Sequence, residues 1–363
     1  MNLLDQRDAA ERVDRSNMRK LIHNFSVQMK EAEQFGLALQ LHSQLGKGVS
    51  KIVFSGLGGS AIGADFIRSY LAYEFPIPLF VNRHYRLPAF VDQTALLVAS
   101  SYSGDTEETL SSVKEGMKRG ARILAITSGG ELARLAETHS FPLIRIPGGI
   151  SPRAALGYSV IPLLVALSKI GFKCAYRPEE LQEAVQVVRS LSESQYGTAV
   201  PQEQNLAKQL AALCFGKYPI IYAGADYFDV VALRWRGQIE ENAKSLASHH
   251  VLPEMNHNEL VGWEHPKELL KEAVVFFLKD ESDHARVRIR MNLTQSVIAQ
   301  HAGEVAELSS QGKSLLARMF SLTHLGDWVS FYLAVLYQVD PTPVEVIQRL
   351  KSELAKEPLK GCG

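Results

Sequence analysis

The stretch KIVFSGLGGSAIG, residues 51–63, joins a short apolar run to a glycine-rich loop and then to a helical pattern. A short run of β-branched and aromatic residues is typical of a buried strand. Glycines let backbone N–H groups close on an anion where a helix begins. The stretch therefore predicts a strand, a ligand-binding turn and a helix, in that order.

The same rhythm of apolar runs and helical stretches continues toward the C-terminus. In the first half the runs lie at residues 52–54, 78–82, 95–99, 122–126 and 142–146. Short runs separated by helices predict a parallel sheet that is covered on both faces. The first half is therefore predicted to be a doubly wound α/β domain.

The rhythm starts again after a polar connection that contains Gly197 and Pro201. Further apolar runs follow at residues 219–223, 273–278 and 304–308. We predict a second sheet of the same kind and divide the chain into residues 1–190 and 191–363. The predicted fold class is α/β, with two doubly wound parallel-sheet subdomains and helical termini.

Composition and charge exclude several classes of protein. The 363 residues suffice for two domains, and 46% hydrophobic with 21% charged residues excludes a disordered or fibrous chain. Lys plus Arg number 39, as do Asp plus Glu. With no basic field to attract a polyanion, nucleic acid is not expected as a partner.

The cysteines and the N-terminus indicate where the protein works. Cys174, Cys214 and Cys362 are far apart and odd in number, which suggests neither a disulfide framework nor a metal site. Residues 1–20 predict an amphipathic helix and lack the apolar core of a signal peptide. The apolar run 160–167 is far shorter than the roughly 20 residues that span a bilayer. We expect a cytoplasmic protein without a membrane partner.

The glycine loop allows two kinds of ligand. Gly56, Gly58 and Ala61 also fit the looser dinucleotide pattern G-x-G-x-x-A, which keeps an NADP-dependent oxidoreductase as an alternative. The second strand ends near Asn82 without an acid to bind a ribose hydroxyl, although Arg83 suits a 2′-phosphate. Tight packing of strand on helix, with no ligand, is the structural alternative.

A second loop carries three aliphatic hydroxyls within six residues. Ser101, Ser103 and Thr106, together with free backbone N–H groups, can form a phosphate cradle that needs no metal. A capping box of Asp105 with Glu108 is the structural alternative. Acidic residues so close to a phosphate favour the cradle only if they point away from it.

Groups that can carry protons gather in the second half. Carboxylates and imidazoles occur throughout residues 236–265 and are the usual proton carriers near neutral pH. The histidines there have no i, i+4 spacing and no cysteine nearby, so no metal site is predicted. Glu240 and Glu241 point about 100° apart on a helix, so we expect at most one of them to face a site.

Five ordered blocks together resemble one known family. They are GLGGSAIG (56–63), SYSGDTEET (101–109), SPRAALGY (151–158), ENAKSLASHHVLPEMNHNEL (241–260) and DPTPVEVIQRLKSEL (340–354). The set is similar to the bifunctional phosphoglucose/phosphomannose isomerases, which are built from two flavodoxin-like sugar isomerase (SIS) subdomains. The resemblance implies the interconversion of glucose 6-phosphate or mannose 6-phosphate with fructose 6-phosphate, without a cofactor.

The resemblance also implies residues that bind the substrate. Gly59 and Ser60 match the glycine loop that lines the sugar site. Ser101, Ser103 and Thr106 match the positions that hold the 6-phosphate.

The catalytic residues follow from the same blocks. Arg153 matches the arginine beside the reacting carbons, and Glu241 matches the catalytic base. His257 matches a ring-opening histidine that reaches in from the neighbouring subunit, so the resemblance implies a homodimer with shared active sites. Lys351 matches a C-terminal lysine that assists ring opening.

The chemistry of the residues agrees with these roles. One carboxylate can move a proton between C2 and C1 through an enediolate with neither metal nor nicotinamide. An arginine stabilises the developing negative charge. A non-catalytic SIS-type sugar-phosphate sensor is the alternative from another class, since it needs the hydroxyl loop but not Glu241, His257 or Lys351.

Overall fold

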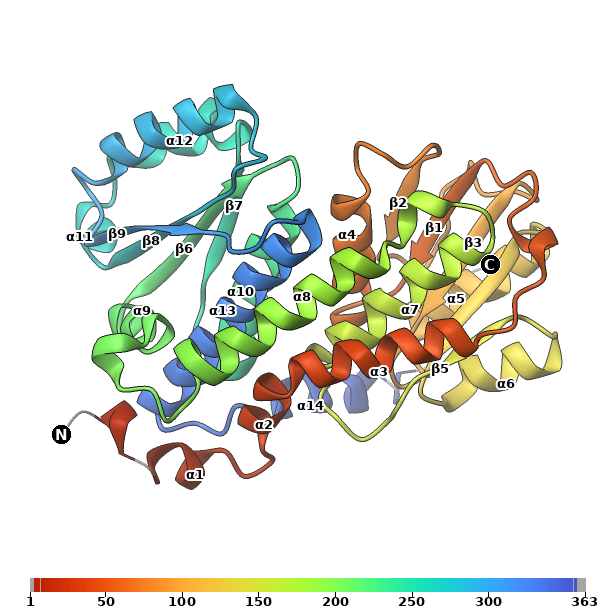
Figure 1. Cartoon of the computed structure of the whole chain (residues 1–363), viewed down its shortest axis with the longest axis horizontal. Coiled ribbons are helices and arrows are strands. Elements are labelled where there is room, and N and C mark those ends of the chain that lie inside the picture. The colour runs from red at the N-terminus through yellow and green to blue at the C-terminus, as the bar shows by residue number, and fades with distance from the viewer. Residues whose placement is uncertain (1–2, 7, 355, 358–363) are drawn as a thin grey trace.

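Two parallel sheets, one in each half of the chain, form the centre of the fold (Figure 1). The structure is a computed structural model that describes residues 3–6, 8–354 and 356–357. The predicted α/β class with two parallel-sheet subdomains is confirmed. All strand pairs in both sheets are parallel, so the helices and loops between the strands must carry the chain back across each sheet.

The first sheet has five strands in the order β2-β1-β3-β4-β5. The strands are β1 (Lys51–Ser55), β2 (Leu79–Asn82), β3 (Ala95–Ser100), β4 (Arg122–Thr127) and β5 (Leu143–Arg145). Ile52 of β1 lies opposite Leu79 on one side and Leu96 on the other. The strand order reverses between β1 and β3, which is where such sheets bind ligands. The glycine loop follows β1 and the hydroxyl loop follows β3, so both lie at this point.

Helices cover both faces of the first sheet. They are α4 (Gly59–Tyr70), α5 (Glu107–Lys118), α6 (Gly130–Thr138) and α7 (Leu156–Lys169), with α3 (Phe25–Ala38) packed outside α7. Side chains alternate along a strand, so Ile52 and Leu96 enter one core with α4 and α7. Val53 and Leu97 enter the other core with α5 and α6. Burial of both faces explains the continuous apolar runs.

The second sheet has four strands in the order β7-β6-β8-β9. They are β6 (Tyr218–Gly224), β7 (Ser248–Leu252), β8 (Ala273–Lys279) and β9 (Glu304–Ser309). The apolar runs predicted β6, β8 and β9 but not β7. As an edge strand that is mostly half-buried, β7 carries His249 and His250 instead of an apolar run.

Apart from α8, which ends the first half, the helices that follow α7 belong to the second half, and one of them is buried. They are α8 (Pro178–Ser190), α9 (Leu206–Cys214), α10 (Asp229–Ala243), α11 (Lys267–Lys271), α12 (Ala285–Ile298), α13 (Leu315–Leu336) and α14 (Glu345–Leu354). Every residue of α13 from Leu316 to Val335 is buried, and α8, α9 and α10 pack around it. No described helix is long and apolar enough to cross a membrane.

Short helical turns complete the connections. They are η1 (Leu3–Asp5), η2 (Ser43–Leu45), η3 (Pro152–Ala154), η4 (Lys173–Ala175), the π-helical η5 (Leu191–Tyr196), η6 (Gln202–Gln204), η7 (Glu254–His257) and η8 (Glu259–Gly262). The division after residue 190 falls where α8 ends and η5 begins. The two halves nevertheless share a core, because Phe66 of α4 stacks on Phe320 of α13 with ring centroids 4.6 Å apart.

The N-terminal region differs from the single amphipathic helix predicted for residues 1–20. It forms α1 (Ala9–Val13) and α2 (Met18–His23), separated by a turn. The Asp14 carboxylate accepts N–H groups of Met18 at 2.7 Å and Arg19 at 2.9 Å. These bonds satisfy the first turn of α2 and stop α1 from continuing.

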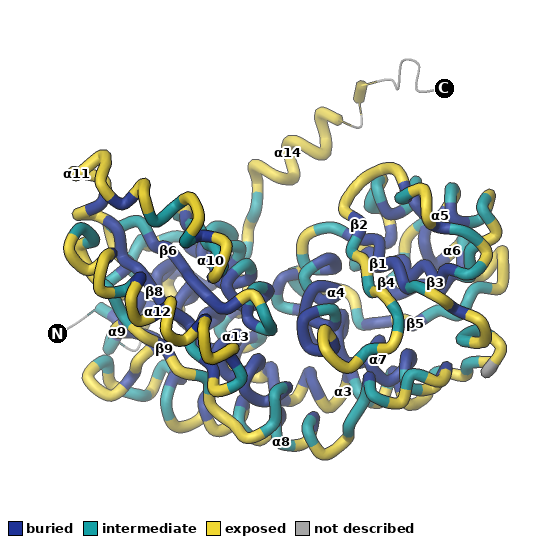
Figure 2. Tube along the Cα trace, turned by 90° about the horizontal axis from the view of Figure 1, so that it is seen from above, coloured by how far each residue is buried: buried dark blue, intermediate teal, exposed yellow. Residues whose placement is uncertain are grey.

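The C-terminal helix α14 stands clear of the body of the molecule (Figure 2). None of its residues is buried. Val346 and Leu350, one helical turn apart, are 84% and 59% exposed. An amphipathic helix with an exposed apolar side needs a partner for that side.

A glycine sets the close contact between α10 and α13. A Cβ at Gly326 would lie 2.4 Å from Nε1 of the buried Trp235. We expect Gly326→Ala to destabilise the fold by about 1–3 kcal/mol, because the indole must shift in a packed core. Gly237→Ala is the matched control, since its Cβ would meet nothing within 4 Å. There we expect a gain of about 0.5–1 kcal/mol. Urea unfolding of the two variants measures both changes, and equal stabilities would refute the packing argument.

Candidate active site

The glycine loop is pressed against the segment that carries Arg153. A Cβ at Gly59 would lie 2.7 Å from the carbonyl oxygen of Pro152, so only glycine allows this approach. Gly58 adopts φ +51°, which also favours glycine. Ser60 is buried, and its Oγ accepts the Tyr102 N–H at 3.2 Å. The glycine loop, η3 and the hydroxyl loop therefore form one packed unit.

The hydroxyl loop is closed on itself. Ser101 Oγ lies 2.8 Å from Thr106 Oγ1 and accepts the Gly104 N–H at 3.1 Å. Ser103 is exposed, and its Oγ accepts the Asp105 N–H at 3.2 Å. The three hydroxyls thus surround one tight turn, as a phosphate cradle requires.

The capping-box alternative for this loop is wrong. Thr106, not Asp105, precedes α5, and its side chain makes no capping bond. Asp105 Oδ1 instead accepts the N–H of Glu131, in the first turn of α6, at 2.9 Å. The carboxylate that seemed to oppose phosphate binding is therefore engaged by the neighbouring helix.

Arg153 is the most highly bonded side chain of the site. It is 4% exposed, and all five of its N–H donors are used. They bind Asn242 Oδ1 (2.6 Å), Ser151 Oγ (2.7 Å), Glu241 Oε2 (3.2 Å) and the carbonyl oxygens of Pro341 (2.5 Å) and Thr342 (3.0 Å). Burial lowers the pKa of Arg153, while the charge of Glu241 acts in the opposite direction. Arg153 therefore joins η3, α10 and the segment that leads to α14.

Lys244 is a second anchor for that segment. Its Nζ donates to the carbonyl oxygens of Pro341 at 3.0 Å and Glu241 at 2.6 Å. Burial and the nearby charge of Arg153 lower the pKa of Lys244 to about 8. Two cations thus hold the backbone at Pro341 beside the end of α10.

A buried network fixes α10 against α13. Nη2 of Arg234 donates to both oxygens of Asp327, at 2.9 and 3.0 Å, and to the Arg153 carbonyl oxygen at 3.0 Å. Gln238 Nε2 donates to Asp327 at 2.7 Å, and Asn242 Nδ2 donates to Ser330 at 2.9 Å. Burial raises the pKa of Asp327, and its contacts with Arg234 and Gln238 oppose the rise. The network pairs Asp327, Gln238 and Asn242 in the core, while Arg234 Nε has no partner among the described residues.

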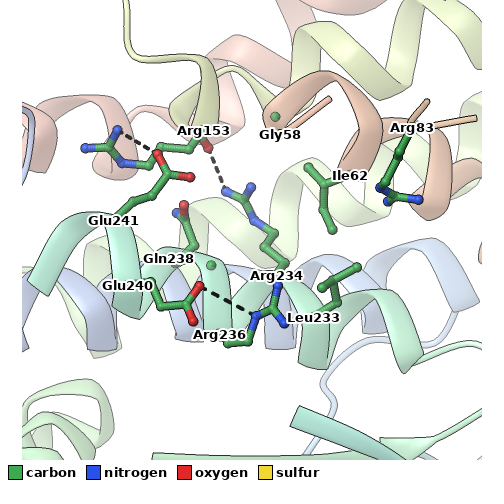
Figure 3. Close-up of a pocket in the computed structure, with 12 residues that line it drawn as sticks. Gly58, Ile62, Arg83, Arg153, Leu233, Arg234, Arg236, Gln238, Glu240 and Glu241 are labelled. Carbon is green, nitrogen blue, oxygen red and sulfur yellow. Dashed lines mark hydrogen bonds and ion pairs between the residues drawn. The ribbon is translucent and has the colours of Figure 1, made fainter. Parts of the chain in front are cut away.

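A cavity of about 260 Å³ lies between the two halves (Figure 3). Its lining includes Gly59 and Arg83 from the first half and Arg236, Glu240 and Glu241 from the second. Both carboxylates line it, so the expectation that at most one faces a site is wrong. Helix α10 lies along the cavity: Glu240 contacts Arg236 one turn earlier at 3.6 Å, while Glu241 contacts Arg153. Burial, with the charge of Glu241, raises the pKa of Glu240.

The structure brings some of the predicted residues together and leaves others outside. Gly59, Arg153 and Glu241 meet at the cavity, and Ser60 ties it to the loop of Ser101, Ser103 and Thr106. His257, in η7, and Lys351, on α14, are both exposed and do not line this cavity.

Sequence reasoning missed the residues that hold Arg153 and α10 in place. Asn242 stood inside a quoted motif but received no role, and Arg234 and Asp327 were not singled out. A signal was present, because Asp327 is the only acid between Leu316 and Val335 of the apolar α13. A lone acid in such a helix predicts a buried cationic partner.

Comparisons with known proteins show the family of the chain. The family described as the bacterial phospho-glucose isomerase C-terminal SIS domain matches residues 203–354. The bifunctional phosphoglucose/phosphomannose isomerase of Caldicellulosiruptor bescii is 46% identical over 337 residues, which cover 92% of this chain and 98% of that one. The chain belongs to this isomerase family. A relative of the same name from Aquifex aeolicus is 39% identical and covers 84% of this chain and 90% of its own.

Solved structures support the fold of this family member. A hypothetical protein of Thermus thermophilus matches with a TM-score of 0.70 and 15% identity, over 97% of this chain and 92% of that one. The C-terminal domain of glucosamine-fructose-6-phosphate aminotransferase from Francisella tularensis matches with a TM-score of 0.67 and 15% identity, over 89% and 96%. At this identity the likeness concerns the fold alone.

The hydroxyl loop makes a direct binding prediction. We expect Thr106→Val to weaken inorganic phosphate binding about tenfold or more, because a hydrogen bond to a charged group contributes about 1.5–3 kcal/mol. Thr109→Val, in the first turn of α5, is the matched control, since the buried Thr109 hydroxyl has no hydrogen-bond partner in the described part of the chain. Calorimetric titration with phosphate compares the two. Equal affinities would show that the loop does not hold the anion.

Proposed function

We propose that the cavity between the two halves is where glucose 6-phosphate and mannose 6-phosphate are interconverted with fructose 6-phosphate. The chain is an aldose–ketose isomerase of the family to which it belongs. The observation that supports this location is the Glu241 carboxylate, held 3.2 Å from the buried Arg153 at the cavity wall. A base next to a fixed cation is what proton transfer through an enediolate requires.

Glu241 acts as the base that moves the proton. Once the sugar ring is open, the carboxylate removes the proton from C2, and an enediolate forms as the C1 carbonyl gains electron density. The C2 hydroxyl proton passes to O1, and the carboxylic acid, after exchange with solvent, returns a proton to C1, which gives the ketose. Transfer between neighbouring carbons on one face needs a single base, and the cavity provides Glu241 at its wall.

Arg153 stabilises the charge that develops on the enediolate oxygens. Its contact with Glu241, at 3.2 Å, is the longest of its five hydrogen bonds. We therefore assign this donor as the one that binds the substrate oxyanion, while the other four keep the guanidinium in place. A cation that does not have to reorganise stabilises a developing charge most effectively.

The loop of Ser101, Ser103 and Thr106 holds the 6-phosphate. The Ser101–Thr106 hydroxyl pair opens to donate to phosphate oxygens, and the start of α5 adds its positive end. Binding energy from this remote group orients the reacting carbons, so its loss lowers turnover as well as affinity. The alternatives lack comparable support: a sensor has no need of the Glu241–Arg153 pair, and Arg83, the candidate for a 2′-phosphate, is paired with Asp65.

A homodimer completes the site. His257 and Lys351 are the residues assigned to ring opening, and both are exposed outside the cavity of their own chain. In the proposed dimer, His257 enters the cavity of the partner. Helix α14 carries Lys351, and its exposed apolar side provides a surface for association.

Replacing the base tests the reaction. We expect Glu241→Gln to lower kcat by about 10²- to 10⁴-fold, because a general base contributes that much, and to leave phosphate binding nearly unchanged. Proton NMR of EDTA-treated enzyme with fructose 6-phosphate in D2O should show glucose and mannose 6-phosphates that carry deuterium at C2. Full activity of Glu241→Gln, or product without deuterium, would contradict this mechanism.

Mixing two inactive variants tests the shared site. Glu241→Gln and His257→Ala chains should each be inactive as homodimers and should regain activity when mixed. Each hybrid dimer then contains one site with an intact Glu241 from one chain and an intact His257 from the other. No recovery despite demonstrated subunit exchange would place both residues in sites completed within one chain.

A further inference from the structure

The loop that carries His257 is anchored on both sides of this exposed residue. His257 is the last residue of η7 and is exposed, while Met255 two positions earlier is fully buried. The Asn256 Nδ2 donates to Thr294 Oγ1 of α12 at 2.7 Å. The side of the loop that precedes His257 is therefore fixed to the core and to α12.

Glu259 fixes the other side of the loop. One oxygen of its carboxylate accepts the hydroxyl of Tyr222 on β6, and the other lies 2.9 Å from Nδ1 of His250 on β7. Tyr222 is fully buried, and its oxygen accepts Nε1–H of Trp263 at 3.1 Å. Burial and the charge of Glu259 raise the pKa of Tyr222, which keeps the phenol as a donor. The Glu259 carboxylate thus bonds the loop to β6 and lies against β7.

The turns around Glu259 would not hold this shape alone. Both η7 and η8 have only four residues, and such short 3₁₀ turns have little intrinsic stability. Asn258 adopts φ −147° and ψ −70° between them, and its Oδ1 accepts the Glu259 N–H at 2.6 Å. The path of the backbone through His257 therefore depends on the side-chain anchors.

We propose that Glu259 is a positioning residue, which holds the His257 imidazole in the orientation needed for ring opening in the partner's cavity. The inference rests on the role of His257 in the proposed function. Proton transfer needs an approach of about 3 Å, and a misplacement of 1 Å can reduce a rate by about 10². In this proposal Glu259 makes no contact with the substrate, since one of its oxygens accepts the Tyr222 hydroxyl and the other lies beside His250.

The first test separates positioning from binding. We expect Glu259→Ala to lower kcat about 10- to 100-fold with little change in KM. Glu259→Gln should restore most of kcat, because its amide oxygen still accepts the Tyr222 hydroxyl. Glu254→Ala is the control in the same loop; Glu254 is exposed, and its carboxylate contacts Asn258 at 3.4 Å. An unchanged kcat in Glu259→Ala would overturn the proposal, and so would a Glu259→Gln enzyme no faster than Glu259→Ala.

The second test uses hybrid dimers and distinguishes positioning from general destabilisation. Glu259→Ala is added to one or the other chain of the Glu241→Gln and His257→Ala mixture. On the Glu241→Gln chain it adjoins the only working His257, and the recovered activity should fall about 10- to 100-fold. On the His257→Ala chain it adjoins a loop that is already inactive, and the recovered activity should be unchanged. Equal losses in both arrangements would refute positioning.

The outcomes also separate this inference from the proposed function. The mixture of Glu241→Gln and His257→Ala chains can fail to recover activity although His257→Ala alone is inactive. The site is then not shared between subunits, and the kcat of Glu259→Ala still tests whether Glu259 positions His257. If His257→Ala retains full activity, the role of His257 fails and Glu259 has nothing to position. Loss of kcat in Glu259→Ala together with an active His257→Ala enzyme would assign Glu259 another role.

Discussion

The site depends on one buried guanidinium whose donors are all used. Arg153 joins the glycine loop through η3, helix α10 through Asn242 and Glu241, and the C-terminal segment through two carbonyl oxygens. Burying such a charge is unfavourable unless every donor is satisfied. The satisfied arginine therefore orders three segments that lie far apart in the sequence, and the cavity exists where they meet.

The two halves of the chain supply different chemistry to that cavity. The first half offers backbone N–H groups and hydroxyls at the switch point of its sheet, which suit an anion. The second half offers carboxylates from α10, supported by a polar network that α13 buries. Shared apolar packing, such as that of Phe66 on Phe320, keeps these two sets of groups in register.

Sequence reasoning reached the fold further than it reached the site. Continuous apolar runs predicted the strands that are covered on both faces. Strand β7 was not predicted, because an edge strand with two histidines has no such run. The loops after β1 and β3 were found because glycines and hydroxyls are local signals. The partners of Arg153 were not predicted, because two of them are backbone carbonyl oxygens, which every residue carries and no sequence pattern distinguishes. Asp105 likewise bonds to another helix, which no local pattern reveals.

The segment from Asp340 to Val344 is the tether of the C-terminal helix. Pro341 and Pro343 restrict its backbone, and the carbonyl of Pro341 is held by Arg153 and Lys244. A pull on α14, from a fused protein, an affinity tag or a surface attachment, is therefore transmitted to the guanidinium that contacts Glu241. Helix α14 has no buried residue, yet it is mechanically connected to the cavity through Pro341 and Arg153.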